Sequence, residues 1–367
     1  MDDRTALDLL IRGFQVSRAI RLVADLGLAD RIAPQEAAHI DDLAAAAGVR
    51  AGQLKRVVRA LSAFGIFTID AGGNVAHTPR SLLLRGDTPG SLHHSARFWT
   101  GSGSWRAWEE LDVAMVGGVP HEAAWGTGRF AYLRDHQDEA RAFDAFMANF
   151  PDDRHAAVAE AYDFSDAGLI ADIGGGNGEM LRQILGRHPT ARGVVFDRLD
   201  VVAAIEPDRL AEGRISVQGG SFLEEVPAGC DTYMMVRVLH DWSDEDAVRI
   251  LRRCKAAMNA GSRLLVVEGL LPANPSEGRP TEYLIDLQMM AMFGAARDRT
   301  QAEFAELLDE AGLKLARVVA TRSTVCVIEA ILPARVSALC VQRSSEARMS
   351  LNTFVNIASV STPVFVL

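Results

Sequence analysis

The sequence predicts a protein of two halves, an N-terminal helical half and a C-terminal half of the doubly wound α/β class. Its 367 residues exceed one average domain. Apolar residues recur at helical spacing through residues 5–115. From about residue 168, short apolar strands alternate with helices, which is typical of a parallel sheet covered by helices.

The composition favours an ordinary globular protein with a large core. Hydrophobic residues make up 49% and charged residues 23%. A net charge of −10 and a pI near 5.4 are a poor match for nucleic acid. The acidic start "MDDRTALDLL" is unlike a signal peptide, and no uncharged apolar run reaches membrane-spanning length. The four cysteines, at 230, 254, 326 and 340, have no paired spacing and indicate a reducing compartment. We therefore expect a soluble cytoplasmic protein without a membrane or nucleic-acid partner.

The sequence of the N-terminal half predicts a winged helix. "LDLLIRGFQVSRAIRLVADLGLADRI" is helical, and the stretch that starts at "HIDDLAAAAGV" gives helix, turn, helix and a short hairpin around "AGGN". Such a module either binds DNA or packs and dimerises. Lys55, Arg56 and Arg59 are only three cations in an acidic chain. This favours packing or dimerisation.

In the second half the expected elements follow one another in order. They are the strand "GLIADI", the helix "GEMLRQILGRH", the strand "GVVFD", the helix "DVVAAI", the strands "RISVQGG" and "TYMMVRVL", the helix "DEDAVRILRRCKAAM", the strand "SRLLVVEGLL", the helix "AEFAELLDEAGL" and the strand "TVCVIEAIL". The remaining segment, from "PARVSALC" to "VFVL", fits neither half. It could be an added strand, a partner-binding tail or a stretch with no selected role.

A glycine-rich loop follows the first strand of this half. Asp172 precedes four glycines, Gly174, Gly175, Gly176 and Gly178, which permit positive φ and close approach of a ligand. Glu179 stands where a dinucleotide fingerprint needs its third glycine, and no Gly-Lys-Ser/Thr follows. Asp197 ends the next strand, where a carboxylate can hold a ribose diol. A ribose and a cationic amino-acid part describe S-adenosylmethionine better than NAD.

Together these motifs resemble the small-molecule O-methyltransferases that bind S-adenosylmethionine, the family of hydroxyindole, caffeate and bacterial polyketide O-methyltransferases. The resemblance covers about residues 5–330 and includes "FDAFM", "ADIGGGNG", "VVFD", "LHDWSDED", "VVEGLLP" and "RDRTQAEF". It implies a winged-helix dimerisation domain at 1–110, linking helices at 111–166, a Rossmann-like methyltransferase domain at 167–332 and an atypical tail at 333–367. In that family the N-terminal half forms a homodimer, closes over the partner's pocket and does not bind DNA.

The stretch "VRVLHDWSDED" has a local explanation and a catalytic one. Locally it is a strand-to-helix turn in which Asp244 or Ser243 caps the helix and Trp242 fills core. The resemblance implies instead that His240 is a general base, because a phenol with a pKa near 10 needs its proton removed. It also implies Glu268 and Asp298 as the acids that orient the histidine.

The resemblance implies two further groups of residues. Cofactor contacts would include Ser221, Phe222 and Arg237, and the acceptor pocket would be lined by Phe143, Met147, Met289, Phe293 and Trp242. These apolar residues suit a flat ring and would serve equally well as core. The chain departs from the family pattern in having Asp298 for a common Glu, Ser221 for an acid and Val236 for a common Lys, whereas Arg237 fits bacterial members.

We therefore predict an O-methyltransferase that uses S-adenosylmethionine to methylate a phenol or enol of a small aromatic metabolite. One alternative is an enzyme of the same fold that binds the cofactor but carries out decarboxylation or hydroxylation. Another, which the charge disfavours, is a winged-helix regulator on DNA. No metal is expected, because a facial triad needs two histidines and none follows His240.

Overall fold

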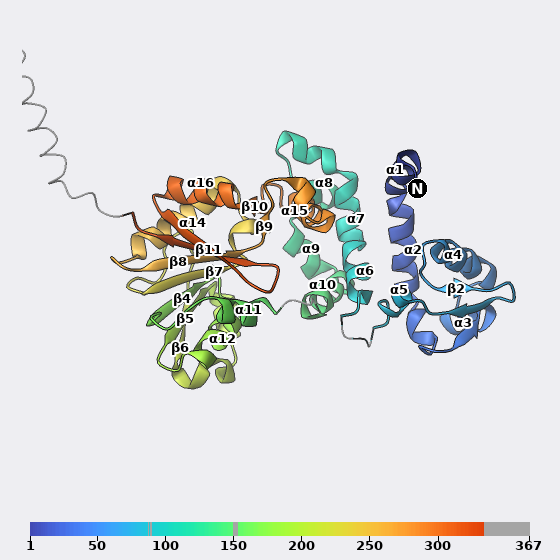
Figure 1. The fold of residues 1–367 in the computed structure, drawn as a ribbon, viewed down its shortest axis with the longest axis horizontal. Coiled ribbons are helices and arrows are strands. Elements are labelled where there is room, and N and C mark those ends of the chain that lie inside the picture. Colours follow the sequence, from blue (N-terminus) through green and yellow to red (C-terminus); the bar gives the residue numbers. More distant parts are fainter. Residues whose placement is uncertain (87, 89, 150–152, 334–367) are drawn as a thin grey trace, which may run out of the picture.

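The computed structural model describes residues 1–86, 88, 90–149 and 153–333. Figure 1 shows a winged-helix lobe at the N-terminus, a lobe built on a large sheet, and a group of helices between them. The prediction for the tail, 333–367, lies outside the described residues except at its first position.

The N-terminal lobe has the predicted helix-turn-helix and hairpin. Its apolar core gathers Leu28, Val58 and Phe67 at 0% exposure. The first helical stretch is broken at Arg12, and a strand that the sequence did not predict, β1, adds a third member to the hairpin. The elements are α1 (Asp3–Ile11), α2 (Gly13–Asp25), β1 (Ala37–His39), α3 (Ile40–Ala47), α4 (Ala51–Ala63), β2 (Thr68–Ile69) and β3 (Asn74–Ala76).

The middle helices come from two distant parts of the chain. They are α6 (His93–Trp99), α7 (Ser102–Glu109), α8 (Pro120–Trp125), α9 (Arg129–Asp135), α10 (Gln137–Asn149) and, from beyond the main strands, α15 (Pro280–Phe293). The short helix α5 (Pro79–Leu82) belongs to the N-terminal lobe, where Arg80 donates to the Phe64 carbonyl, and α11 (Arg154–Ala161) packs in the core of the sheet lobe through Val158. The amide of Gln288 on α15 accepts a hydrogen bond from the Trp108 indole (2.6 Å) and donates one to the Ser104 hydroxyl (3.3 Å). This buried amide docks α15 on α7.

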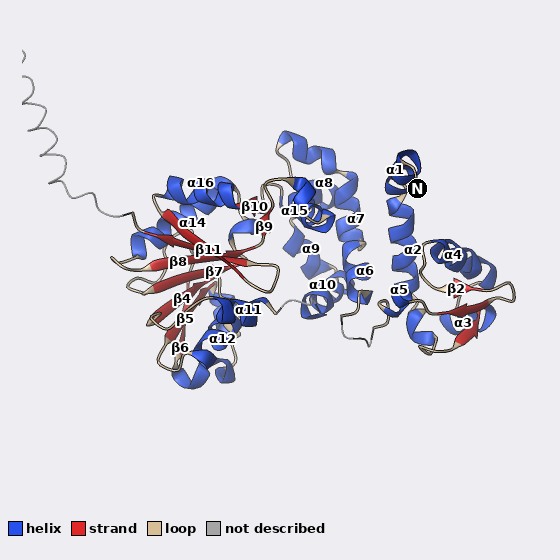
Figure 2. Cartoon of the chain, in the orientation of Figure 1, coloured by secondary structure: helices blue, strands red, loops and turns tan. Residues whose placement is uncertain are grey.

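The large sheet has seven strands in the order β11-β12-β8-β7-β4-β5-β6 (Figure 2). Their bounds are β4 (Leu169–Ile173), β5 (Arg192–Asp197), β6 (Ile215–Gly219), β7 (Thr232–Val236), β8 (Arg263–Glu268), β11 (Lys314–Ala320) and β12 (Cys326–Ile331). The doubly wound prediction is confirmed, but the sheet is not wholly parallel, because β12 runs antiparallel to β8 and to β11. The connection from β11 to β12 is only residues 321–325, and a short connection permits antiparallel pairing alone.

Both faces of the sheet are buried. Along β4, Ala171 and Ile173 belong to one apolar cluster and Ile170 to the other. The covering helices are α12 (Glu179–Arg187), α13 (Leu199–Ala203), α14 (Asp244–Ala257) and α16 (Gln301–Ala311), and short elements are β9 (Leu270–Leu271), β10 (Arg299–Thr300), η1 (Ala29–Arg31), η2 (Leu111–Val116), η3 (Pro207–Gly213), η4 (Leu239–Asp241) and η5 (Pro275–Glu277). Within the described ranges, no helix is long and apolar enough to cross a membrane.

The strand order places a crevice at β4 and β7. Strands β4, β5 and β6 extend to one side of this point and β7 and β8 to the other. In open α/β sheets, ligands bind outside the carboxyl ends of the strands where the order reverses. The glycine loop follows β4 and the His240 turn follows β7, so both candidate motifs meet at this edge.

Candidate active site

The glycine loop after β4 is tied to the end of β5. The Gly174 amide donates to the Phe196 carbonyl (2.8 Å), and the Gly176 amide donates to the Asp197 carboxylate (2.9 Å). Gly174 and Gly176 have φ of +72° and +55°, which L-residues with a side chain rarely adopt. A β-carbon on Gly174 would lie 2.8 Å from Val238, so the loop passes close to β7 as well.

Asp172 is a buried acid without a partner. It is 1% exposed, and neither carboxylate oxygen has a hydrogen-bond partner among the described residues. Burial, together with the nearby charge of Asp197, raises the pKa of Asp172 to about 7. An orphaned carboxylate beneath a glycine loop fits a ligand with a cationic group, as the ammonium of S-adenosylmethionine is.

Asp197 and Phe222 complete this part of the edge. One Asp197 carboxylate oxygen accepts a hydrogen bond from the Gly176 amide (2.9 Å), and the other accepts one from the Arg198 amide (2.7 Å). A carboxylate can accept about four hydrogen bonds, so Asp197 can still accept two from a ribose diol. Phe222, in the turn after β6, lies 3.8 Å from a β-carbon built on Gly174. Ser221 precedes it and is half-buried. These residues group as the sequence predicted.

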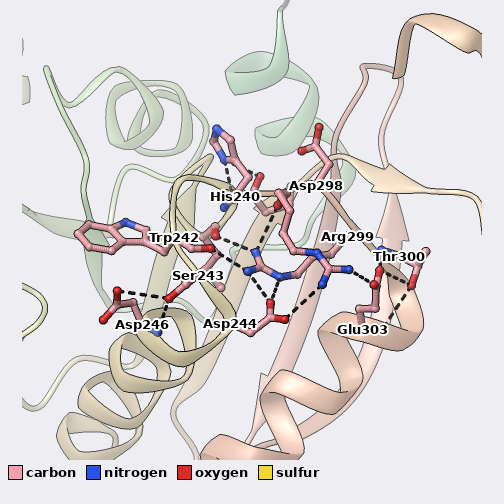
Figure 3. A network of polar contacts seen from close by, with 12 residues as sticks. His240, Trp242, Ser243, Asp244, Asp246, Asp298, Arg299, Thr300 and Glu303 are labelled. Carbon is pink, nitrogen blue, oxygen red and sulfur yellow. Dashed lines mark hydrogen bonds and ion pairs between the residues drawn. The ribbon is translucent and has the colours of Figure 1, made fainter. Parts of the chain in front are cut away.

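The His240 turn connects β7 to α14. Ser243 is the N-cap of α14 and accepts a hydrogen bond from the Asp246 amide (3.1 Å), which confirms the capping prediction for Ser243. The Trp242 ring packs edge-on against Phe222 at 5.6 Å, so it borders the cofactor side of the edge. The His240 side chain points away from α14 (Figure 3).

Glu268, the last residue of β8, fixes His240. Its carboxylate lies 3.2 Å from His240 Nδ1 and accepts from the His240 backbone amide (3.3 Å). Burial alone would raise the pKa of Glu268, but the charge and hydrogen bonds of His240 and the charge of Arg237 hold that pKa below its usual value. The ionised carboxylate on Nδ1 leaves Nε2 as the other ring nitrogen that can exchange a proton. Nε2 lies 3.3 Å from the Asp241 carboxylate.

Arg237 joins two of the predicted acids. Its guanidinium lies 3.1 Å from Glu268 and 3.3 Å from Asp298. Burial works against its charge, but these two acids raise the pKa of Arg237 overall. Its backbone has φ of +55°, a conformation that costs a non-glycine residue about 1–2 kcal/mol. In this structure the Arg237 side chain is thus engaged with the acids rather than with the glycine loop.

Asp298 reaches His240 only through Arg237 and Glu268. Its backbone amide donates to Asp286 on α15 (2.8 Å), which sets the position of the whole residue. The sequence did not single out Asp286. Burial raises the pKa of Asp286. The hydrogen bond from the Asp298 amide lowers that pKa, and the charge of the Asp298 carboxylate raises it further.

Arg299 is the second site residue that sequence reasoning missed. Its side chain is fully buried, and it donates to the carbonyls of Leu239 and Trp242 (both 2.8 Å) and to Asp244 (2.9 Å), as Figure 3 shows. It therefore holds the turn on both sides of His240. The available signal was its place in "RDRTQAEF", a motif that carried the family resemblance.

The predicted acceptor residues lie on the middle helices. The Phe143 ring is 5.6 Å from Phe98, and the Phe293 ring is 5.6 Å from Phe130. Met147 is 50% exposed, and Met289 is half-buried on α15. The structure thus forms two aromatic groups from these positions, and it places Trp242 apart from them, beside Phe222.

Comparison with known proteins identifies the family. A family model described as an O-methyltransferase domain matches residues 108–314, and one described as an O-methyltransferase dimerisation domain matches residues 9–86. A phenazine O-methyltransferase of Lysobacter antibioticus is 38% identical over 328 residues, covering 88% of this chain and 94% of that protein.

Solved structures agree with this match. Mitomycin 7-O-methyltransferase is 30% identical with a TM-score of 0.78, covering 90% of this chain and 97% of that one. An O-methyltransferase from neocarzinostatin biosynthesis, solved with S-adenosylmethionine and 2-hydroxy-5-methyl naphthoic acid, is 31% identical with a TM-score of 0.71, covering 86% and 95%. The chain belongs to the S-adenosylmethionine-dependent O-methyltransferase family, which confirms the predicted family, enzyme class and cofactor.

The Asp172 environment predicts pH-dependent cofactor binding. Because the pKa of Asp172 is about 7 without ligand, the acid must lose a proton to pair with the cofactor's ammonium. Calorimetry with S-adenosylhomocysteine should therefore show affinity rising with pH by up to about tenfold per unit below pH 7 and levelling off above it. Asp172→Asn should bind weakly and without this dependence. A flat profile in the wild type would contradict the assignment.

The same shift predicts the opposite trend for the unliganded protein. A raised carboxyl pKa stabilises the fold at low pH, and this contribution is lost as pH rises from about 4 through about 7. Urea unfolding of Asp172→Asn should therefore show less loss of stability over that window than the wild type.

Arg299→Ala should destabilise the His240 turn. It leaves the buried Leu239 carbonyl and the partly buried Trp242 carbonyl without this donor, and we expect a loss of about 3 kcal/mol in the free energy of unfolding, measured in urea. The control is Arg249→Ala, which removes a half-exposed ion pair to Asp246 on α14 and should cost less than about 1 kcal/mol. Equal effects of the two variants would show that Arg299 does not hold the turn.

Proposed function

We propose that this enzyme methylates a phenolic or enolic hydroxyl of a small aromatic secondary metabolite, with His240 as the general base. The observation that supports this most is the fixed imidazole: Nδ1 is held by the buried Glu268, beside the glycine loop at the same sheet edge. The cofactor would supply an electrophilic methyl group on its sulfonium. The protein's own task is to deprotonate and orient the acceptor.

The proton would move to Nε2 of His240. With the carboxylate of Glu268 on Nδ1, that nitrogen would carry the hydrogen, and Nε2, which Asp241 flanks at 3.3 Å, would be the nitrogen that accepts a proton. The acceptor hydroxyl gives its proton to Nε2, its oxygen forms the bond to the methyl carbon, and the carbon–sulfur bond breaks. Glu268 and Asp241 then stabilise the imidazolium, because Asp241 lies 3.3 Å from Nε2. The proton leaves to solvent before the next turnover.

A flat aromatic acceptor suits the middle helices. Phe143, Met147, Met289 and Phe293 offer rings and polarizable side chains, which pack well against a planar ring. The neocarzinostatin relative was solved with a hydroxylated naphthoic acid, an acceptor-sized aromatic molecule. We place the reaction in the cytoplasm, where Cys230, Cys254 and Cys326 would stay as the free thiols they are in this structure.

We also propose that the enzyme works as a homodimer through α1 and α2. Leu10, Ile11 and Phe14 are 77%, 67% and 58% exposed, and Leu7 beside them is 59% exposed. Contiguous large apolar side chains of this kind mark an interaction surface. They lie in or directly beside the segment matched by the dimerisation model.

His240→Ala should lower kcat by roughly 10² to 10⁴, the usual contribution of a positioned base, while binding of S-adenosylhomocysteine stays within about twofold. The assay measures S-adenosylhomocysteine formed over a panel of phenols and naphthols. Release of that product also separates methyl transfer from other chemistry on this fold.

Two controls sharpen this test. Glu268→Gln should lower kcat as well, because an amide can present its carbonyl or its NH₂ to Nδ1 and no longer stabilises the imidazolium. His188→Ala, a histidine beside Phe164 on the far side of α12, should retain full activity. If His240→Ala kept full activity with a phenol that is neutral at the assay pH, His240 would not be the general base.

Phe14→Glu should convert the dimer into a monomer, because a buried charge at the interface is costly. Size-exclusion chromatography with light scattering measures the mass directly. Leu199→Glu, at a 73% exposed apolar position on α13, is the matched control and should stay dimeric. A monomeric wild type at micromolar concentration would refute the proposed assembly.

A further inference from the structure

Arg129, at the start of α9, is a buried cation that the chemistry described so far does not use. It is 5% exposed, and its two terminal guanidinium nitrogens have no hydrogen-bond partner among the described residues. A second orphan lies nearby: His121 is fully buried, its Nε2 has no partner, and its ring packs against Tyr132, one turn after Arg129, at 5.3 Å.

Such a cation is unusual, because buried charges are paired or hydrogen-bonded. Arg299 of the same chain shows the ordinary case, with two carbonyls and Asp244 as partners. The negative charge of Glu139 acts on Arg129 from a distance. The Glu139 carboxylate accepts its hydrogen bond from the Ser102 amide (2.8 Å) and not from the Arg129 terminal nitrogens. Burial lowers the pKa of Arg129, although a guanidinium stays charged at neutral pH.

The Arg129 guanidinium lies over one aromatic group of the proposed acceptor pocket, and the residue that follows it in α9 belongs to the other group. Its guanidinium carbon is 6.0 Å from the centre of the Phe98 ring, which is 5.6 Å from Phe143. The next residue, Phe130, has its ring 5.6 Å from Phe293. Figure 1 shows the helices involved, α6, α9 and α10, next to one another in the middle layer.

The local sequence makes room for this side chain. A β-carbon on Gly103 of α7 would collide with the Arg129 guanidinium and would lie 2.7 Å from the Tyr132 ring. Only glycine therefore leaves the guanidinium in place. Because its terminal nitrogens make no hydrogen bond to any residue that the structure describes, an arriving anion would not have to displace one.

We propose that Arg129 binds a carboxylate on the acceptor, so that the substrate is an aromatic hydroxy acid. The inference rests on the proposed function and narrows it. A guanidinium presents parallel N–H donors that match the two oxygens of a carboxylate, and the flanking rings cover the flat body of the acid. The anion would supply the partner that the protein lacks at this position.

The test compares a matched acid and amide. 1-Naphthoate and 1-naphthamide have the same shape and differ in charge, and calorimetry would measure their binding to the full-length enzyme saturated with S-adenosylhomocysteine. We expect the acid to bind at least about tenfold more tightly, as charge-assisted pairing at a desolvated site implies. In Arg129→Met the preference should fall below about twofold, and in Arg129→Lys it should be intermediate.

Arg106→Met is the control, because Arg106 lies in the same helical layer, is exposed, and packs over Trp125 at 4.5 Å. It should keep the preference for the acid. Equal binding of acid and amide to the wild type, binding of neither, or a preference that survives in Arg129→Met would each overturn the proposal.

Melting temperatures separate recognition from a structural role. Removing an unpaired buried charge relieves its desolvation, so unliganded Arg129→Met should melt at or above the wild-type temperature. A lower melting temperature with an unchanged preference for the acid would assign Arg129 to the fold instead.

The proposed function fails in a different way. If the enzyme methylates 1-naphthol but shows no preference for acids, the proposed function holds and the role of Arg129 is refuted. If naphthoate binding depends on Arg129 but no S-adenosylhomocysteine forms from any hydroxylated acid or naphthol, the role of Arg129 holds and the proposed function is refuted.

Discussion

The buried guanidinium of Arg299 is the constraint on which the His240 turn depends. A strand can deliver a side chain to the edge of a sheet, but the turn that follows it has no ladder to hold it. Here the carbonyls on both sides of His240, those of Leu239 and Trp242, accept from Arg299, and the His240 carbonyl itself accepts from the Arg297 amide (2.9 Å). Asp244, at the first turn of α14, completes the set. The position of the imidazole is therefore fixed by a segment almost 60 residues further along the chain.

Two buried acids at the same edge have pKa values shifted in opposite directions, because one lacks a charged partner and the other has two. Among the described residues Asp172 has no hydrogen-bond partner, so burial raises its pKa to about 7, and a cation bound beside it would stabilise the ionised carboxylate. Glu268 is as deeply buried, yet His240 and Arg237 hold its pKa below the usual value. The first environment suits reversible binding of a charged cofactor, and the second keeps an imidazole in one orientation. Arg237 accomplishes this only by adopting a left-handed backbone conformation, which the pairing with Glu268 and Asp298 offsets.

Much of this arrangement could be predicted from sequence, because the signals are local. The alternation of strands and helices gave the sheet, the glycines after Asp172 gave the loop, and Ser243 gave the start of α14. The strand β12 was predicted, but β11 was missed, because residues 314–320 have no regular burial pattern and are mostly on the surface. The residues that pair with the side chains of Arg237 and Arg299 could not be predicted from the sequence. Their contacts span 31 to 61 residues and depend on side-chain direction, which neither periodicity nor spacing records. The family resemblance implied that Arg237 contacts the cofactor, which stays a prediction, and in this structure its side chain is paired with Glu268 and Asp298.

The helix α15 connects the proposed acceptor pocket to the edge of the sheet that carries His240. On one side, Gln288 fastens it to α7 through Trp108 and Ser104, and Phe293 packs against Phe130, the neighbour of Arg129. On the other side, Asp286 accepts from the Asp298 amide and so sets the acid that Arg237 links to Glu268. A single rigid helix thus touches both the aromatic groups and the acids behind His240. Both sets of contacts belong to one helix of 14 residues, so the proposed acceptor pocket and the acids behind His240 share a single element of the fold.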